Sequence, residues 1–274
     1  MFIKKSVKAK LFTSLLLVAI IPLILISAIL YFNTNQGLES MMEKNLMASK
    51  ETISEQLNDV SEDLLELTKS YANNPEFLQA YNSGERERLA EVVSPVFERL
   101  TTEHQIDVFE FGDENGTVFL RGHNLEKFGD DKSDVQAIQS ALDNQAISGF
   151  EFGSSGLSVR AFVPLTYNDQ VIGTLQTGLD GQVIKSITES LKGVQLNIMN
   201  MEGEVLVTSN EKSAGTRFDD SSIISKVKSG EEVSREASNN MEYYMPLYDP
   251  TNSEVIGVIQ ISQDASDINS LTIN

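Results

Sequence analysis

Residues 171–180 read VIGTLQTGLD, and residues 255–264 repeat this pattern as VIGVIQISQD. Three further matches precede these stretches in the same order, at offsets of 82 to 90 residues. They are GTVFL at 116–120 with GEVLV at 203–207, FGDD at 128–131 with FDD at 218–220, and PL at 164–165 with PL at 246–247. A period of this length indicates two consecutive copies of a small domain and not a solenoid of short repeats. We therefore expect a tandem duplication.

Each copy contains short runs of alternating apolar and polar residues separated by turn residues, which is the pattern of β-strands. The first copy also contains a short amphipathic run after Ser133, which predicts a helix capped by that serine. An antiparallel sheet with helices on one side belongs to the α+β class. The strands are expected near 106–111, 117–122, 148–152, 157–166 and 171–179, with a connecting helix at 181–191 before the second copy begins at 194.

The N-terminal region predicts a membrane anchor. Leu11–Phe32 is a run of 22 residues without a charged side chain, long enough as a helix to cross a hydrocarbon core about 30 Å thick. Four lysines precede this run, and the first acidic residue is Glu39. We therefore expect residues 1–10 in the cytoplasm and the chain after residue 32 outside the cell membrane. The alternative is a cleaved signal peptide, whose apolar core is normally shorter, about 7–15 residues.

A long helical pattern lies between the anchor and the duplicated region. Apolar residues recur at spacings of three, four or seven from Leu38 to Tyr71, which predicts a stalk helix over 36–73. The stripe suits either the seam of a homodimeric coiled coil or packing against the duplicated domains. A second amphipathic run at 85–104 is expected to pack back on the first.

Composition argues against several classes of function. All 40 acidic residues but only 17 of the 21 lysines and arginines follow residue 33, which leaves that part with a net charge of −23. This charge argues against nucleic acid and against an anionic membrane surface as partners. The chain has no cysteine and only two histidines, and it lacks a nucleophile elbow and a phosphate-binding glycine loop. We therefore expect no catalytic residue, no metal site and no cofactor.

Several runs of the first copy resemble one protein family. FLRGHN at 119–124, KFGDD at 127–131, SGFEF at 148–152 and VRAFVP at 159–164 are similar to the first unit of the extracellular double-Cache (PAS-like) sensor regions of bacterial methyl-accepting chemotaxis receptors. The resemblance extends over residues 11–264. It implies stalk and packing helices at 33–103, a membrane-distal Cache unit at 104–180, a membrane-proximal unit at 194–264, and a lead-in to a second membrane helix at 265–274.

This resemblance implies that the chain is the ligand-sensing input region of a chemoreceptor and not an enzyme. The same type of input on a sensor histidine kinase or a cyclic-dinucleotide enzyme is the alternative. An exported enzyme or an adhesive surface protein represents a different class of function, for which the residues offer less support.

The strands of the first copy suggest where a ligand binds. Alternation along the strand places Phe119, Arg121 and His123 on one face. Arginine suits bidentate binding of a carboxylate, so we expect a small organic anion, most simply a carboxylate. The residues expected to bind it are Phe119, Arg121, His123, Arg160, Phe162 and Gln176.

Other interpretations of these residues remain open. Arg121 can instead form a structural ion pair with Asp130 or Glu151, and His123 can be structural. An amine held by Glu151 and Asp180 is the rival ligand, because these carboxylates also occur in the first copy.

The second copy serves as an internal comparison. At the positions of Arg121, Arg160 and Phe162 it carries Thr208, Glu242 and Tyr244. We therefore expect no cation on its corresponding sheet face, so that the first copy receives the ligand and the second relays the signal.

Overall fold

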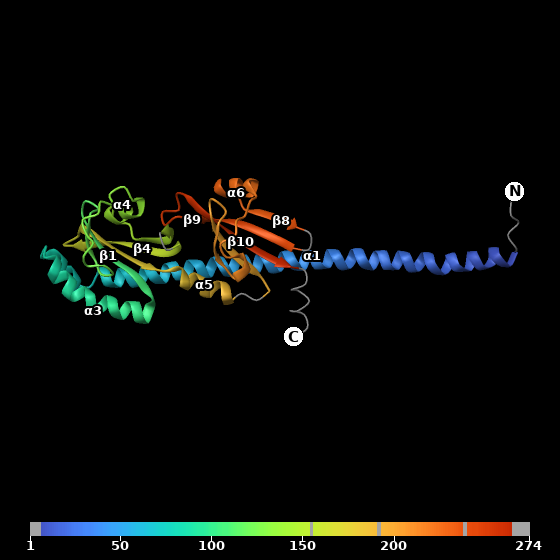
Figure 1. Cartoon of the computed structure of the whole chain (residues 1–274), viewed down its shortest axis with the longest axis horizontal. Coiled ribbons are helices and arrows are strands. Elements are labelled where there is room, and N and C mark those ends of the chain that lie inside the picture. Colours follow the sequence, from blue (N-terminus) through green and yellow to red (C-terminus); the bar gives the residue numbers. More distant parts are fainter. Residues whose placement is uncertain (1–6, 154–155, 191–192, 238–239, 265–274) are drawn as a thin grey trace.

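The computed structural model describes residues 7–153, 156–190, 193–237 and 240–264. One long helix, α1 (Val7–Ala72), runs along the molecule, and two small sheets lie one after the other against it (Figure 1). We call β1–β5 with α2–α4 the first unit, and β6–β10 with α6 the second unit. The other elements are α2 (Pro75–Asn82), α3 (Arg86–His104), β1 (Ile106–Asp113), β2 (Val118–Arg121), α4 (Gln136–Leu142), β3 (Ile147–Gly153), β4 (Gly156–Tyr167), β5 (Gln170–Leu179), α5 (Gly181–Ser190), β6 (Gln195–Asn200), β7 (Val205–Thr208), a 3-10 turn (Glu211–Ser213), α6 (Ser221–Lys228), β8 (Val233–Ala237), β9 (Asn240–Tyr248) and β10 (Val255–Asp264).

The two sheets have the same topology. The strand order is β2-β1-β5-β4-β3 in the first unit and β7-β6-β10-β9-β8 in the second. Neighbouring strands are antiparallel in both. An isolated bridge after the first hairpin also recurs, between Thr117 and Asp131 and between Glu204 and Arg217. The tandem duplication and the α+β class are therefore confirmed.

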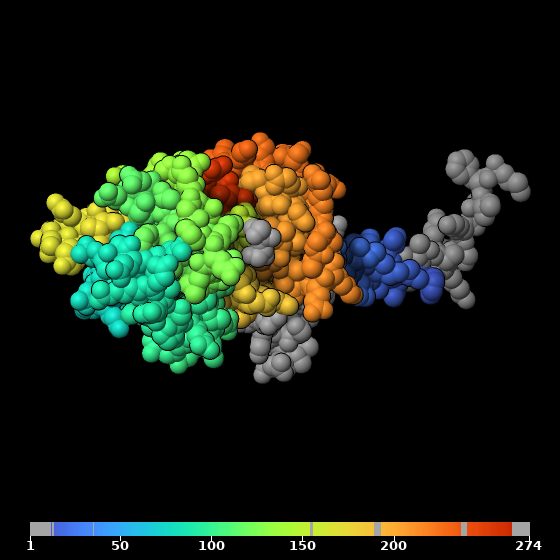
Figure 2. All heavy atoms as spheres, turned by 60° about the vertical axis from the view of Figure 1, so that its left-hand side comes forward, coloured from blue at the N-terminus to red at the C-terminus, as the bar shows by residue number. Residues whose placement is uncertain are grey.

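Helix α1 has 66 residues and a length of roughly 100 Å. The sequence predicts an anchor and a stalk as separate segments, but one helix continues through Pro22 and Gly37. Among the described residues it is the one helix that is long and apolar enough to cross a membrane, and its apolar N-terminal part projects away from both units (Figure 1, Figure 2). Residues 1–6 of the expected cytoplasmic segment and the expected lead-in at 265–274 lie outside the described residues.

The C-terminal half of α1 provides core residues to both units. Leu46, Ile53, Leu57 and Leu64 are buried in one hydrophobic cluster that also contains side chains of both sheets. These residues belong to the apolar stripe that the sequence assigned either to a dimer seam or to the duplicated domains. At these positions the structure shows packing against the domains.

Polar contacts fix the position of α1 along both sheets. The hydroxyl oxygens of Thr68 on α1 and Thr177 on β5 lie 2.5 Å apart in the buried interface of the first unit. In the second unit, Nζ of Lys50 lies 2.7 Å from the carboxylate of Glu232 and donates to the hydroxyl of Tyr243 at 3.1 Å. Because a helix rises about 1.5 Å per residue, a slide of one residue would break these contacts.

Helices α2 and α3 cover the end of the first unit that lies farthest from the apolar part of α1 (Figure 1). Helix α3 matches the run predicted at 85–104, whereas the sequence did not predict α2. The side chain of Asn74 accepts hydrogen bonds from backbone N–H groups of the first turn of α2 and so caps it. The hydroxyl of Tyr81 donates to the carbonyl oxygen of Gly112 at 2.9 Å, which links α2 to the sheet.

Helix α4 packs on the opposite side of the first sheet from α1, against Phe162. It begins at Gln136 and has Val135 at its N-cap, which makes no side-chain cap. The predicted cap by Ser133 is therefore wrong. The backbone N–H of Ser133 donates to the side chain of Asp131 in the preceding turn.

Replacing Ile53 by Ala is expected to lower the free energy of unfolding by about 2–5 kcal/mol, because it empties a fully buried site. Glu55→Ala on the same helix is the control, because Glu55 is exposed and substitutions at exposed sites usually change stability by about 0.5 kcal/mol or less. Chemical denaturation of the detergent-solubilised chain measures both variants. Equal losses of unfolding free energy in the two variants would contradict the role of α1 as a provider of core residues.

Candidate functional site

We call the side of the first sheet that carries α4 its outer face and the side against α1 its inner face. A row of cross-strand neighbours runs across the outer face, and such neighbours point to the same side of a sheet. Arg121 pairs with Glu110, Glu110 with Gln176, and Gln176 with Phe162. All four are buried, with exposed fractions from 1% to 8%. Three of the residues predicted to bind a ligand therefore lie in one row, with Glu110 between Arg121 and Gln176.

Arg121 is paired with carboxylates of its own unit. Its Nε donates to Glu110 at 2.8 Å, and its Nη1 lies 2.6 Å from the carboxylate of Asp130. The second oxygen of Glu110 accepts a hydrogen bond from Lys132 at 2.6 Å. The hydrogen bond from Arg121 holds the pKa of Asp130 below its usual value. The structural ion pair with Asp130 is thus present, while sequence reasoning missed Glu110 and Lys132.

Arg160 lies in the adjacent row of the outer face. It is opposite Gly178 on β5, and its guanidinium crosses over that glycine, since a Cβ atom at Gly178 would lie 1.6 Å from Nη1. The side chain reaches Asp107 at the start of β1, with Nη1 3.1 Å from the carboxylate. The side chain of Asp107 is 33% exposed, so solvent weakens this ion pair more than the buried pair of Arg121 and Glu110.

Glu151 adds a further carboxylate beside Arg160. It pairs with Ser158, two residues from Arg160 along β4, and so points to the same face. Burial raises the pKa of Glu151, and Arg160 partly opposes that rise. The ion pairs of this face, together with Glu151, therefore involve three cations and four carboxylates. They are Arg121, Lys132 and Arg160, with Asp107, Glu110, Asp130 and Glu151.

The predicted position of Phe119 on the outer face is wrong. The pairing of β1 with β2 is irregular, and Phe119 is an extra residue between Val118 and Leu120. A bulge of this kind breaks the alternation of side chains. The ring of Phe119 packs against Tyr81 of α2, with 5.3 Å between the ring centroids, and against the inner hydrophobic cluster.

His123 holds together the end of the first hairpin. Its Nδ1 accepts a hydrogen bond from the backbone N–H of Phe109 at 3.3 Å, and its ring lies 6.4 Å from that of Phe97 on α3. Burial lowers the pKa of His123, which favours the neutral imidazole. These contacts correspond to the structural role that the sequence left open for this residue.

Gln176 contains a buried acceptor without a partner. The residue is 8% exposed, and its Oε1 accepts no hydrogen bond from the described part of the chain. The equivalent residue of the second unit is Gln260, which has the corresponding strand partners. Oε1 of Gln260 accepts from Asn197 at 2.8 Å, and its Nε2 donates to the hydroxyl of Tyr244 at 3.2 Å. The same position is therefore satisfied in the second unit and unsatisfied in the first.

The outer face of the second unit contains a cation, contrary to the expectation from the sequence. Arg235 on β8 donates to Glu242 at 2.9 Å and to the hydroxyl of Tyr244 at 3.0 Å. The residue equivalent to Arg235 in the first unit is Gly149, opposite Arg160. Comparison at the positions of the first unit's cations therefore could not reveal Arg235. The second unit therefore has an arginine at the position where the first unit has Gly149, whose backbone packs against Pro250.

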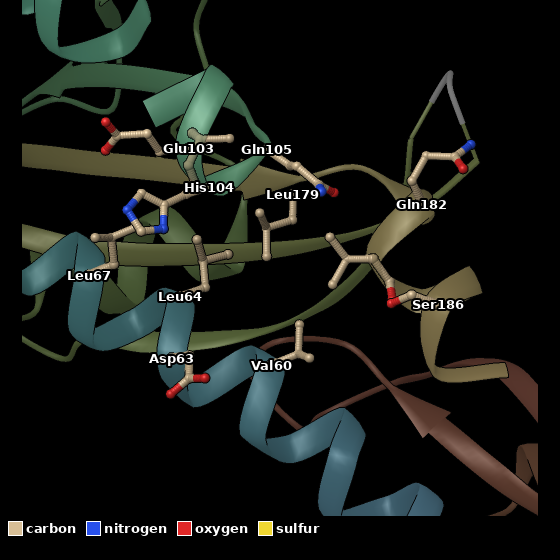
Figure 3. Close-up of a pocket in the computed structure, with 12 residues that line it drawn as sticks. Val60, Asp63, Leu64, Leu67, Glu103, His104, Gln105, Leu179, Gln182 and Ser186 are labelled. Atoms are coloured by element: carbon tan, nitrogen blue, oxygen red, sulfur yellow. The ribbon is translucent and has the colours of Figure 1, made fainter. Parts of the chain in front are cut away.

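A hollow of about 780 Å³ lies beside α1, between the end of α3 and helix α5 (Figure 3). Val60, Leu64 and Leu67 of α1 line it together with Leu179 at the end of β5. Its lining also includes the polar residues Asp63, Glu103, His104, Gln105, Gln182 and Ser186. This hollow has a mixed apolar and polar lining and is distinct from the charged outer face.

Asp180 lies at the junction of β5 and α5. Its Oδ1 accepts a hydrogen bond from the backbone N–H of Gln182, and it lines a second hollow of about 510 Å³ between the two units. An amine held by Glu151 and Asp180 stays a prediction. Within the described ranges, no group of three or more acidic or histidine side chains is arranged to hold a metal ion.

Solved structures with similar folds come from different kinds of receptor. The sensor domain of the V. cholerae histidine kinase DctB has a TM-score of 0.57 and 11% identity over 82% of this chain and 98% of that chain. A domain of a sensory box/GGDEF family protein from Vibrio parahaemolyticus has a TM-score of 0.55 and 12% identity over 85% of this chain and 99% of that chain. The ligand-binding domain of the Campylobacter jejuni chemoreceptor Tlp3 in complex with L-valine has a TM-score of 0.54 and 16% identity over 84% of this chain and 95% of that chain. At these identities the likeness establishes the fold alone.

No curated protein sequence matches the chain significantly. A family model, dCache_3, described as the double sensory domain of two-component sensor kinase, matches residues 40–268. The matched segment contains the stalk part of α1 and both sheets. The double-Cache architecture expected from the sequence is thus confirmed, whereas the type of receptor is not specified. The chain belongs to the dCache_3 family of double sensory domains.

Proposed function

We propose that this chain is the input region of a transmembrane receptor and that it binds a small carboxylate on the outer face of the first unit. The observation that carries the proposal is a difference in hydrogen bonding: Oε1 of Gln176 has no partner in the described part of the chain, whereas Oε1 of Gln260 accepts from Asn197. Leaving a buried acceptor unpaired costs about 1–3 kcal/mol, and the second unit avoids this cost with its own Asn197. An external donor that reaches Gln176 would remove the cost in the first unit.

The charges around Gln176 favour a ligand with two polar groups. Arg160 is the cation best placed for a ligand carboxylate, because its carboxylate partner Asp107 is partly exposed. Oε1 of Gln176 requires an N–H or O–H donor. An amino acid or a 2-hydroxy acid supplies both groups, and an ammonium group would also interact favourably with the excess of carboxylates. The Tlp3 domain binds L-valine in its crystal structure, which is a precedent within the same fold.

Binding at this face requires α4 to move. Arg121, Gln176 and Phe162 are buried beneath α4 and the segment 122–135. The next residue of β5, Thr177, points to the inner face and contacts Thr68 of α1. A shift of β5 on ligand binding therefore acts directly on α1, and this helix extends into the proposed membrane anchor. Two packed arrangements with different ligand affinities would produce the signal.

For the output we propose a methyl-accepting chemoreceptor, on the strength of the sequence resemblance. The matched family model names two-component sensor kinases, which makes a sensor kinase the second candidate. The coding sequence downstream of residue 274 in the gene distinguishes a chemoreceptor signalling domain from a kinase.

We propose that the receptor is a homodimer in which α1 lies beside α1 of a second copy. The buried stripe is occupied by the chain's own sheets, so the dimer must use other positions. Met41 and Met47 are 45% and 37% exposed on α1, beyond its apolar anchor. The hollow lined by Val60 and Leu67 lies on the same helix.

The Arg160→Ala variant is expected to weaken ligand binding by roughly 30-fold or more, because losing one partner of a buried charge interaction typically costs about 2–5 kcal/mol. Glu242→Gln at the equivalent position of the second unit is the control and should change affinity less than about twofold. Calorimetric titration of the full chain in nanodiscs with the standard L-amino acids and matching 2-hydroxy acids measures both. Tight binding of a simple amine that Arg160→Ala leaves unchanged would refute a carboxylate ligand.

A cysteine at residue 47 should form a disulfide-linked dimer under mild oxidation, because Met47 is exposed on α1 and the chain has no native cysteine. Ile53→Cys is the control, since this position is fully buried in the chain's own core. Non-reducing electrophoresis of membranes measures both variants. The dimer model is wrong if Met47→Cys stays monomeric or if both positions cross-link equally.

A further inference from the structure

The turn between β9 and β10, residues 249–254, is longer than its counterpart in the first unit. Six residues connect Tyr248 to Val255, whereas two residues connect β4 to β5. Asp249 organises the longer turn, because its carboxylate accepts hydrogen bonds from the backbone N–H groups of Thr251, Ser253 and Glu254 at 2.7 to 3.0 Å. This turn is therefore a fixed structure that only the second unit possesses.

The turn touches the first unit at Gly149. A Cβ atom at Gly149 would lie 2.6 Å from Cα of Pro250, so the two backbones are in direct contact. Gly149 is the strand partner of Arg160, and the position where its side chain would project is on the outer face. Pro250 therefore lies on the same face as the guanidinium proposed to hold the ligand.

The same turn also holds the start of α4. The side-chain oxygen Oε1 of Gln136, the first residue of α4, accepts a hydrogen bond from Ser253 at 2.9 Å and lies 3.5 Å from the hydroxyl of Thr251. Asp249 also adds to the rise in the pKa of Glu151, whose main cause is burial. The turn thus reaches both the strand and the helix that enclose the outer face.

We propose that the turn at 249–254 is a wall of the first unit's ligand site, so that the second unit helps to set ligand affinity and senses occupancy through the contact of Pro250 with Gly149. The affinity part rests on the proposed function, while the contact between the units does not. Movement of α4 during binding would pull on Ser253 through Gln136. The second unit is then coupled to the site by direct contact as well as through α1.

Gly149→Ala is the main test, and Gly153→Ala on the same strand is its control, because a Cβ atom at Gly153 meets nothing within 4 Å. Added volume at a tight contact forces the neighbours apart. In the full chain, Gly149→Ala should raise amide hydrogen exchange roughly tenfold at the start of α4 and in the turn, and weaken binding of the tightest L-amino acid roughly tenfold. Ser253→Ala, a milder change, should raise exchange at the start of α4 by a smaller factor. Gly153→Ala should change neither quantity.

The possible outcomes separate this proposal from the proposed function. If amide hydrogen exchange in Gly149→Ala and Ser253→Ala is the same as in Gly153→Ala, the proposed coupling between the turn and the first unit is wrong. If exchange rises but amino-acid affinity is unchanged, the turn is not a wall of the site. If the unsubstituted chain binds no amino acid or hydroxy acid, the proposed ligand class fails, and the exchange data alone then support the contact between the units or overturn it.

Discussion

Both sheets bury their inner faces against one helix, α1, whose side chains form a single hydrophobic cluster with them. This shared burial constrains how a signal can pass. Helix α1 cannot slide freely, because Thr68 contacts the first sheet and Lys50 the second. Close-packed interfaces change between discrete arrangements and do not deform continuously. A ligand on the outer face would therefore act by favouring one packed arrangement of β5 and α1 over another.

The duplicated fold has diverged at a few side chains of the outer face. The second unit fills its outer face with Arg235, Asn197 and Tyr244, which satisfy Gln260 and Glu242. The first unit has Gly149 where the second has Arg235. In the first unit, Gln176 keeps an unpaired buried oxygen. The two sheets share topology and register, so the difference lies in these side chains and not in the fold.

The sequence predicted the architecture well because periodicity, the apolar run and the repeat all report directly on backbone structure. The strands of the first unit and helix α3 lie close to their predicted positions. Alternation failed at Phe119, where a bulge places one more residue in β2 than in β1. Helix α2 escaped prediction because it is short, and its buried Phe77 packs against Phe109 and Phe111, which are distant in the sequence.

The site could be predicted only in part. The sequence identified Arg121, Arg160, Phe162 and Gln176, which the structure places together on the outer face. It missed Glu110 and Lys132, since cross-strand pairing and loop position decide which carboxylate meets which cation. The alternating pattern of β1 put Glu110 on a known face of the sheet, so this carboxylate could have been found by pairing β1 with β2.

The replacement of Gln176 and Gln260 by Leu, one at a time, tests most directly whether the first unit alone has kept a binding site. Gln176→Leu removes an unpaired buried acceptor, so it should raise the melting temperature of the ligand-free chain and abolish the thermal shift caused by amino acids or hydroxy acids. Gln260→Leu breaks a satisfied network and should lower the melting temperature while leaving the ligand-induced shift in place. A loss of stability in Gln176→Leu equal to that in Gln260→Leu, or an undiminished ligand-induced shift in Gln176→Leu, would contradict a binding site in the first unit.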